Sequence, residues 1–343
     1  MPKNTVLDGL DMRIVTALSE HGRLTMRDLS KTVGLSPTPC KARLERLEAE
    51  KIILGYHADV DVEQLAELSL FLVTLTVQPS LSRQLEAFLH ASPYVVCADT
   101  LFGSVDYLLT IYARSSRHYH EIMAPIAALH IRYQTWVVSH RIKTLHAHRV
   151  LAQIKRADSG RLPDEPARCA GRPVGSRDGL KLDRIDLKIL TALSQNGRQT
   201  IAELAEAVQL SATPCATRLE KLEANGLIRG YYADVDLERL GEFSTYYCSI
   251  LQRSPSSRLL RKLEALIESC PYIVSAEKTY GSLDFILCIL ARSRQHYNEL
   301  LLPLEECDVD CETWPVSRSI FRPQIQRLVG HLAREDITRD CRA

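Results

Sequence analysis

Residues 33–45 (VGLSPTPCKARLE) and residues 208–220 (VQLSATPCATRLE) carry one pattern twice, 175 positions apart. In each copy a serine, Ser36 in the first, precedes a helix-forming run, and serine is favoured at the position that caps a helix. Gly34 suits the end of a preceding helix, whereas the second copy has Gln209 there. If that turn needs a positive φ, glutamine costs about 1 kcal/mol. Each stretch therefore predicts a helix end, a tight turn and a new helix.

Two further helices are expected around this turn. Apolar residues recur at helical spacing between Leu7 and Leu18. Thr25 can cap a second helix, and the helix after the tight turn extends to about Lys51. Three helices, the last two separated by a tight turn, are typical of a helix-turn-helix DNA-binding unit, whose later helix enters the major groove.

The whole chain is a tandem repeat. Residues 16–19 (TALS) reappear at 191–194 with the same offset, whereas residues 103–106 (GSVD) match 281–284 (GSLD), three positions later than that offset requires. A three-residue insertion in the second copy is therefore expected opposite residues 69–93. A repeat this long can fold by itself, so we interpret the chain as a duplicated two-domain protein.

The expected domains follow this repeat. They are a helix-turn-helix domain at 1–58, an α/β domain at 59–150, a linker at 151–181, a second helix-turn-helix domain at 182–233, a second α/β domain at 234–330 and a tail at 331–343. The linker is rich in proline and glycine and lacks apolar periodicity, which predicts a flexible connection.

The α/β domain of each copy alternates strand and helix patterns. The expected elements are strand 68–77, helix 83–90, strands 95–100 and 107–112, helix 118–129 and strand 133–142, and in the second copy 245–251, 259–269, 273–279, 285–290, 296–304 and 312–320. The order βαββαβ is that of a ferredoxin-like sandwich. The fold class is therefore α+β: two tandem copies of a three-helix winged helix-turn-helix domain, each followed by a ferredoxin-like βαββαβ domain.

The composition excludes several classes of protein. Apolar residues make up 45% and charged residues 25% of the chain, as in globular proteins, and the net charge of +1 requires any DNA-binding surface to be local. Residues 1–11 lack a signal-peptide pattern and no apolar run is long enough to cross a bilayer, so we expect a cytoplasmic protein with reduced cysteines. Cys307 and Cys311 lack a second ligand pair at zinc spacing, and we expect neither a metal site nor a cofactor.

The repeated motif resembles a known family. Residues 35–48 (LSPTPCKARLERLE), followed by residues 53–58 (ILGYHA), are similar to the leucine-responsive/asparagine-regulator (Lrp/AsnC) family. The resemblance covers each repeat almost end to end. It implies a sequence-specific DNA-binding transcriptional regulator that responds to an amino acid or related metabolite and assembles as a homo-oligomer. Because family members pair identical chains, the fusion of two diverged copies predicts unequal operator half-sites.

The resemblance assigns the DNA contacts to the later helix of each motif and its flanks. Cations there can hold phosphates, while residues near the helix start can contact base edges. The expected DNA-contacting residues are Arg27, Ser36, Thr38, Pro39, Lys41, Arg43 and Arg46, and in the second copy Ser211, Thr213, Pro214, Thr217, Arg218 and Lys221. Ala216 replaces Lys41 in the second copy, which predicts a weaker or different half-site. The competing interpretation is an amphipathic helix whose cations pair with Glu45, Glu48 and Glu50.

The resemblance also places a sensor function on the α/β domain, which in the family pairs through its sheet and binds the effector near the paired surface. The glycine of the Gly-x-x-Asp hairpin permits close backbone approach to a ligand carboxylate, and the aspartate can pair with an ammonium group. The expected effector-binding residues are Thr100, Gly103, Ser104, Val105, Asp106 and Trp136, and in the second copy Thr279, Gly281, Ser282, Leu283, Asp284 and Trp314. The competing interpretation is a simple turn with a capping aspartate.

Two other functions stay open at this point. Sirohaem decarboxylases resemble this fold, occur as paired or fused halves, and would need side chains that converge on tetrapyrrole carboxylates. The candidates for that role are His118, His120, His140, Arg141, His146, His148, His296 and Arg318. The helix-turn-helix motif is intact in both copies, which favours a regulator that is not an enzyme. The second alternative is a ligand-binding protein without DNA affinity.

Overall fold

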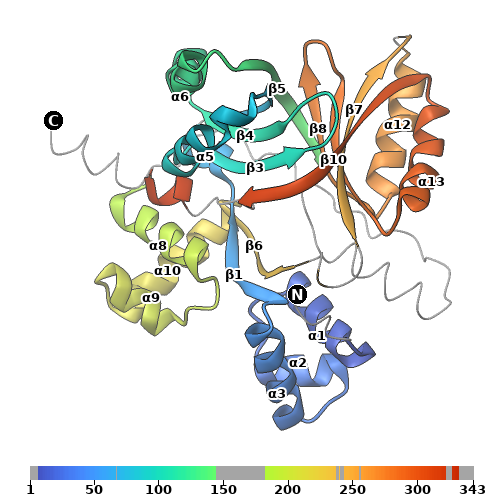
Figure 1. Ribbon diagram of the computed structural model, residues 1–343. Coiled ribbons are helices and arrows are strands. Elements are labelled where there is room, and N and C mark those ends of the chain that lie inside the picture. The colour runs from blue at the N-terminus through green and yellow to red at the C-terminus, as the bar shows by residue number, and fades with distance from the viewer. Residues whose placement is uncertain are drawn as a thin grey trace, which may run out of the picture. The chain divides into compact units, whose positions relative to one another are not determined.

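The computed structural model describes residues 7–66, 68–143, 182–236, 239, 243–254, 256–321 and 327–331 (Figure 1). These residues have the expected α+β fold, and they divide into two compact units. One unit holds the three-helix domains of both copies, and the other holds the βαββαβ domains of both copies. Each domain therefore packs with its counterpart from the other copy rather than with its neighbour in the sequence. The expected linker lies outside the described residues.

The first helix-turn-helix copy has the three expected helices. They are α1 (Gly9–Glu20), α2 (Met26–Val33) and α3 (Pro37–Ala49), followed by the strand β1 (Ile53–Val60) and the short helix α4 (Val62–Ala66). The Asp8 carboxylate caps α1 by accepting hydrogen bonds from the amides of Leu10 and Asp11, both at 2.9 Å. Gly34 ends α2 at a φ of 75°, the left-handed conformation that turns the chain sharply into α3.

The second copy repeats this arrangement with one conformational cost. Its elements are α8 (Arg184–Gln195), α9 (Ile201–Val208), α10 (Ala212–Ala224) and the strand β6 (Ile228–Val235). Gln209 ends α9 at a φ of 61°, so the second turn needs the same left-handed residue as the first. The cost of about 1 kcal/mol expected for a side chain at this position therefore applies.

Each three-helix domain has its own core. Ile14 and Leu18 of α1 and Leu47 of α3 are almost completely buried. Cys40 and its counterpart Cys215 have no exposed surface, and burial raises the pKa of both thiols. The repeated cysteines therefore pack as small apolar side chains.

The strands β1 and β6 join the two copies of the helix-turn-helix domain. They pair antiparallel over most of their length, with Tyr56 opposite Ala233 and Ala58 opposite Tyr231 (Figure 1). Each strand directly follows the later helix of its helix-turn-helix motif, α3 or α10, which is called the recognition helix below. The ribbon therefore connects the two recognition helices through the backbone.

The second unit contains both βαββαβ domains. The first copy is β2 (Ser69–Thr76), the single turn η1 (Pro79–Leu81), α5 (Ser82–Ala91), β3 (Val95–Leu101), β4 (Tyr107–Ala113), α6 (Ser116–Ala128) and β5 (Arg132–Lys143). The second is β7 (Ser244–Gln252), α12 (Ser257–Ser269), β8 (Ile273–Tyr280), β9 (Phe285–Ala291), α13 (Arg294–Glu305) and β10 (Val309–Phe321). Every expected strand and helix of these domains is present, with ends within three residues of the prediction.

The two four-stranded sheets close into one barrel. The strand order is β10-β3-β4-β2-β5-β8-β9-β7, and β7 returns to β10. Each copy contributes the order expected of a ferredoxin-like sheet, and the pairs β5–β8 and β3–β10 join the copies. Closure satisfies the backbone hydrogen bonds of the strands that would otherwise be sheet edges.

The interior of the barrel is apolar around two tryptophans. Trp136 and Trp314, whose ring centroids are 6.4 Å apart, pack with Leu72, Leu108 and Ile286 from both copies. On the outside of the second sheet, the helices α12 and α13 cover a separate core. The pairing of the copies is therefore stabilised by a buried apolar interface as well as by strand hydrogen bonds.

The three-residue insertion lies in the helix α12. The helices α5 and α12 begin at Ser82 and Ser257, still at the first offset, but end at Ala91 and Ser269, at the second offset. The insertion therefore lengthens the helix of the second copy by nearly one turn.

Pro315 lies where β10 changes partner. It is opposite Tyr246 of β7, and Val316 is the first residue that pairs with β3. A proline within a strand indicates either a sheet edge or a bulge, and the edge does not apply here because β10 closes the barrel. The alternative, a local irregularity, is present as a register shift between Val316 and Arg318.

Candidate nucleic-acid interface and effector hairpins

The N-terminal end of α3 presents exposed polar side chains. Ser36, Thr38, Pro39 and Lys41 are all exposed. Ser36 occupies the N-cap position, but its hydroxyl makes no capping hydrogen bond. The start of this helix therefore offers hydroxyl groups and a cation to a ligand, which is the chemistry needed to contact base edges and phosphates.

The second recognition helix, α10, begins in the same way but carries fewer cations. Ser211, Thr213, Pro214 and Thr217 are exposed, and the Ser211 side chain also makes no capping hydrogen bond. Thr217 donates its hydroxyl hydrogen to the carbonyl oxygen of Thr213 at 3.2 Å. With Ala216 in place of a lysine, hydroxyl and methyl groups dominate this surface.

Two of the basic residues expected to contact DNA form ion pairs with α1. Arg43 Nη1 lies 2.6 Å from Asp8 Oδ2 and 2.8 Å from Asp11 Oδ1, and Arg46 also pairs with Asp11. These contacts raise the pKa of Arg43. The pKa of Asp8 is lowered, mainly by the hydrogen bond from the Asp11 amide. Arg43 therefore fixes the recognition helix against α1.

The same pairing occurs in the second copy. Arg218 Nη1 lies 2.6 Å from Asp183 Oδ2 and 2.8 Å from Asp186 Oδ1. Sequence reasoning did not connect the two halves of this contact, although the Leu-Asp-x-x-Asp motif at the start of α1 and α8 is repeated together with the arginine. The signal available in the sequence was that Asp8, Asp11 and Arg43 recur with the same spacing as Asp183, Asp186 and Arg218.

The competing interpretation, in which the cations of α3 only pair with glutamates of the same helix, is supported by one weak contact. Lys41 lies 3.7 Å from Glu45, and about two thirds of each side chain is exposed, so this pair contributes little. Glu48 instead accepts a hydrogen bond from the Tyr56 hydroxyl at 2.6 Å. Lys41 therefore stays accessible to a phosphate at the start of α3.

The helices α2 and α9 differ in charge. Arg27 and Lys31 are exposed on α2, and the matching positions of α9 hold alanine and Glu206. Glu203, which forms a capping box with Thr200, matches Asp28 of α2, so the difference in charge comes from the two replaced cations. Because DNA is a polyanion, α2 is electrostatically suited to lie near phosphates and α9 is not.

The Gly-x-x-Asp hairpins are held by their aspartates. Asp106 Oδ2 accepts a hydrogen bond from the Val77 amide at 2.7 Å, and the Asp106 amide donates to the Leu75 carbonyl oxygen at 2.8 Å. Asp284 makes the equivalent contacts with Gln252 and Ile250 at the same distances. Each aspartate therefore ties its hairpin to the end of the neighbouring strand.

Each hairpin also lies against the strand of the other copy. Gly281 has a φ of 120°, and a Cβ there would lie 3.8 Å from the Trp136 ring. Trp136 Nε1 donates to Ser282 Oγ at 3.1 Å, and Ser104 hydrogen-bonds Glu312. The hairpins and tryptophans singled out from the sequence are thus brought together across the two copies.

The remaining expected effector residues have varied positions. Val105 and Leu283 pack against the apolar interior of the barrel, so their side chains serve the core. Thr100 and Thr279 donate their hydroxyl hydrogens to carbonyl oxygens, at 2.9 Å to Arg318 and at 2.7 Å to Leu283. Among the described side chains, buried Trp314 Nε1 lacks a hydrogen-bond partner.

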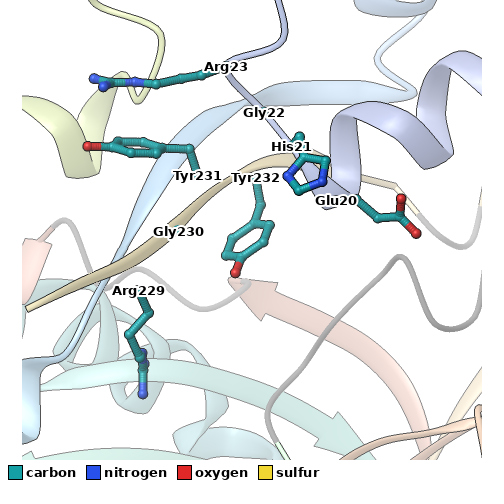
Figure 2. Close-up of a pocket in the computed structure, with 8 residues that line it drawn as sticks. All are labelled: Glu20, His21, Gly22, Arg23, Arg229, Gly230, Tyr231 and Tyr232. Atoms are coloured by element: carbon teal, nitrogen blue, oxygen red, sulfur yellow. The ribbon is translucent and has the colours of Figure 1, made fainter. Parts of the chain in front are cut away.

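A hollow lies in the helix-turn-helix unit, at the junction of its two copies (Figure 2). Its volume is about 280 Å³, and its lining residues are Glu20, His21, Gly22, Arg23, Arg229, Gly230, Tyr231 and Tyr232. Arg229 pairs with Asp59 at 2.9 Å, and Arg23 extends over the Tyr231 ring (Figure 2). Sequence reasoning did not foresee this hollow, because its residues come from different copies.

Comparison with known proteins identifies the family. A winged helix-turn-helix DNA-binding family matches residues 7–53 and 182–229, and the Lrp/AsnC ligand-binding domain family matches residues 70–147. The transcriptional regulatory protein DoeX of Halomonas elongata is 32% identical over 157 residues, which are 45% of this chain and 99% of DoeX. The chain belongs to the Lrp/AsnC family. The leucine-responsive regulatory protein of Rhizobium meliloti, a further relative, is 36% identical over 36% of this chain and 79% of that protein.

Solved structures of a siroheme decarboxylase resemble this Lrp/AsnC protein over both copies. The siroheme decarboxylase NirDL matches 94% of this chain and 98% of its own, with a TM-score of 0.59 and 11% sequence identity. At this identity the likeness shows a shared fold alone. None of the helices in the described part of the chain has the length and apolar character needed to span a membrane.

Proposed function

We propose that this Lrp/AsnC protein is a transcriptional regulator that carries a complete pair of DNA-reading helices within one chain. The observation that carries the proposal is the β1–β6 ribbon, which joins two helix-turn-helix domains with intact recognition motifs into one compact unit. A helix-turn-helix dimer presents one recognition helix to each half-site. The fused copies provide the same two helices without a second chain.

The DNA contacts follow from exposure and charge. We infer that Ser36, Thr38, Pro39 and Lys41 contact the major groove from the first copy, with Arg27 on phosphates. Ser211, Thr213, Pro214 and Thr217 have the equivalent role in the second copy, with Lys221 on phosphates. Arg43, Arg46 and Arg218 act first by orienting the recognition helices, through Asp11 and Asp186. The two half-sites are unequal, because Ala202 and Glu206 of α9 replace the cations Arg27 and Lys31 of α2.

The barrel unit supports the sensor part of the proposal. The effector is an amino acid or related metabolite, bound at the surface around the Gly-x-x-Asp hairpins and controlling DNA binding or assembly. Chains associate further into a homo-oligomer, and the protein acts in the cytoplasm. In this proposal Gly103, Ser104 and Asp106, with their counterparts Gly281, Ser282 and Asp284, form the effector surface.

The chain is proposed to have no enzymatic role, although its fold is shared with a decarboxylase. His118 and His296 use Nδ1 to accept hydrogen bonds from the amides of Arg114 and Arg292, at 3.2 and 3.1 Å. Both imidazoles also pack edge-on against tyrosine rings. These contacts give the histidines a structural role at the starts of α6 and α13. His146 and His148 lie outside the described residues.

The test is an electrophoretic mobility shift with the DNA upstream of the protein's own gene. Binding is measured at about 50 and about 200 mM salt, because phosphate contacts make affinity fall steeply between them. Each of the twenty amino acids is then added singly. A sequence-selective, salt-sensitive shift that one amino acid alters supports the proposal. No selective binding at low salt contradicts it, and a Soret band in the purified protein then points to a tetrapyrrole enzyme.

A matched pair of variants identifies the DNA surface. Thr38→Ala/Lys41→Ala removes a hydroxyl and a cation from the start of α3. Arg117→Ala removes a cation from α6 in the barrel unit, where its side chain is 91% exposed. The first variant is expected to weaken selective binding and the second to leave it unchanged. Equal effects would remove the assignment to α3.

A further inference from the structure

Two Gly-Arg pairs occupy matching positions directly after α1 and α8. Arg23 Nε donates to the Gly197 carbonyl oxygen at 2.6 Å, and Arg198 Nε donates to the Gly22 carbonyl oxygen at 2.7 Å. Each guanidinium also makes a second, longer bond to the other copy, from Nη2 to a carbonyl oxygen two residues further on. The arginines thus exchange contacts between the two helix-turn-helix domains.

Each guanidinium also lies over a tyrosine ring. Arg23 Cζ is 3.7 Å from the centroid of the Tyr231 ring, and Arg198 Cζ is 4.1 Å from that of Tyr56 (Figure 2 shows the first pair). Tyr56 belongs to the first copy and Tyr231 to the second, so both contacts cross the repeat. The planar guanidinium can stack and donate to a carbonyl oxygen at once, which a lysine ammonium cannot do.

The tyrosines connect these arginines to the recognition helices. The Tyr56 hydroxyl donates to Glu48 of α3 at 2.6 Å, and the Tyr231 hydroxyl donates to Glu223 of α10 at 2.5 Å. Burial, followed by the hydrogen bond to the glutamate, raises the pKa of both tyrosines, so both stay protonated donors at neutral pH. A continuous set of contacts therefore runs from each recognition helix, through its own tyrosine, to the arginine of the other copy.

The glycines allow the copies to approach closely. The Gly22 amide donates to the Tyr231 carbonyl oxygen at 2.7 Å, and the Gly197 amide donates to that of Tyr56 at 2.8 Å. A Cβ on Gly22 would lie 2.9 Å from the backbone of Tyr232, and one on Gly197 would lie 2.7 Å from that of His57. A side chain at either position would push the strands away.

We propose that Arg23, Tyr231, Arg198 and Tyr56 form a clasp that sets the separation and mutual rotation of α3 and α10, so that one chain encodes the spacing of its two half-sites. The inference rests on the proposed DNA-binding function. The β1–β6 ribbon alone does not fix this geometry, because a two-stranded ribbon twists and is marginally stable by itself. The clasp ties the helices, rather than only the strands, to the opposite copy.

The first experiment measures the clasp without DNA. Amide hydrogen exchange is followed at Gly22 and Gly197 in the full-length protein and in Arg23→Ala/Arg198→Ala. Both amides donate across the repeat, so their protection reports how firmly the copies are held together. Exchange at these two amides is expected to accelerate at least ~10-fold in the variant, while buried amides of α1 and α8 change little. Unchanged protection at Gly22 and Gly197 overturns the inference.

The second experiment measures the consequence for DNA. Half-sites are located by footprinting the wild-type protein, and duplexes are then made with one to five base pairs inserted between them. Wild type is expected to lose at least ~10-fold in affinity for the five-base-pair insertion, which rotates one half-site by about half a turn. The double variant is expected to vary less than ~3-fold across the series and to bind a single half-site as wild type does. Wild-type spacing dependence in the variant overturns the inference, whereas absence of wild-type binding contradicts the proposed function instead.

Three further variants separate positioning from charge and from loss of fold. Arg229→Ala removes ion pairs with Asp59 and Asp61, which also cross the repeat but involve neither the arginines nor the tyrosines of the clasp. It is expected to keep the wild-type spacing preference. Arg23→Lys/Arg198→Lys keeps the charge and is expected to lose the preference. If the alanine variant unfolds, Tyr56→Phe/Tyr231→Phe keeps the stacked rings and removes only the bonds to the glutamates, and an unchanged preference there rejects the clasp.

Discussion

The Asp11 carboxylate lies 2.8 Å from Arg43 Nη1, although only 1% of the Asp11 side chain is exposed. The same carboxylate pairs with Arg46 and accepts a hydrogen bond from the Asp8 amide at 3.1 Å. A carboxylate at the start of α1 therefore organises the recognition helix as well as its own helix. Arg43 and Arg46, two of the cations expected to contact DNA, therefore already form ion pairs with this buried carboxylate in the absence of DNA.

Asp11→Asn tests how much this arrangement contributes to stability. The amide keeps the size of the carboxylate but loses its charge, so Arg46 loses its ion pair with Asp11 and Arg43 keeps only the one with Asp8. The free energy of unfolding is expected to fall by about 2–4 kcal/mol. Urea denaturation measures it, with Asp8→Asn as the control, because half of the Asp8 side chain is exposed. A loss at Asp11 no larger than that at Asp8 would count against the buried pair.

The N-cap carboxylates predict a loss of stability in acid. The pKa of Asp8 is lowered from 3.8, first by the backbone hydrogen bond from Asp11, and that of Asp183 is lowered as well. A carboxyl group with a lower pKa in the folded state stabilises it above the unfolded pKa and loses that contribution as the pH falls through the folded value. Stability is therefore expected to decline below about pH 4.

The comparison for this pH effect is between wild type and Asp8→Asn/Asp183→Asn. Urea denaturation at pH 6 and at pH 3 gives the free energy of unfolding for each protein. The variant is expected to lose less stability than wild type between these two pH values, because it lacks the two titrating caps. A decline as large as that of wild type would assign acid sensitivity to other carboxylates.

The charge difference between α2 and α9 predicts how DNA affinity can be raised. Glu206→Lys places on α9 the cation that Lys31 provides on α2. Affinity for the operator is expected to rise, and the slope of log affinity against log salt to become steeper by about 0.9 for one added phosphate contact. Glu299→Lys adds the same charge on α13 of the barrel unit. Equal steepening by the two variants would indicate a general charge effect without a phosphate contact at α9.

Local structure was predictable from the sequence, and pairing between distant segments was not. Helix caps and turns depend on neighbouring residues, so Ser36, Gly34 and the strained Gln209 could be assigned from the chain alone. The closure of the barrel depends on which strand edges meet, and β5 could have paired with another chain as well as with β8. The family resemblance and the fusion implied that the two copies pair through their sheets, but they did not give the strand pairs β5–β8 and β3–β10 that join them.

The candidate sites show the same division. Exposure of the start of α3 follows from helical periodicity, which places Cys40, Leu44 and Leu47 on the buried side. The engagement of Arg43 with Asp11 requires two helices to be packed, and no local pattern states it. The clasp between Arg23 and Tyr231 was still harder to foresee, because its partners are about 200 residues apart and belong to different copies.

Asp106 allows its structural and ligand-binding roles to be separated. Its carboxylate accepts the Val77 amide hydrogen, which an asparagine carbonyl oxygen can also do. Asp106→Asn is therefore expected to leave the free energy of unfolding within about 0.5 kcal/mol of wild type, whereas Asp106→Ala lowers it by about 1–2 kcal/mol. If the carboxylate pairs with an amino group of the effector, Asp106→Asn abolishes the response to it in the mobility shift. A normal response in Asp106→Asn leaves the aspartate with its turn function only.

Cys311 is expected to be more reactive than three buried cysteines of the barrel unit. Its pKa is lowered, first by a hydrogen bond from the Cys248 thiol, and its side chain is partly exposed. Cys248 is completely buried and its pKa is raised, and Cys97 and Cys288 are likewise buried with raised pKa values. Since the thiolate is the nucleophile, iodoacetamide at pH 7 should alkylate Cys311 before these three.

Peptide mapping by mass spectrometry measures the rate at each of these thiols in the native protein, and Cys248→Ala provides the control. Without the Cys248 thiol, the Cys311 thiolate loses its hydrogen-bond donor, so its pKa rises and its alkylation at pH 7 slows. The rates at Cys97 and Cys288 should not change, because burial and the Asp99 carboxylate, rather than Cys248, raise the pKa of both thiols. Faster alkylation of Cys311 in Cys248→Ala would mean that packing by Cys248, rather than its hydrogen bond, controls the reactivity of Cys311.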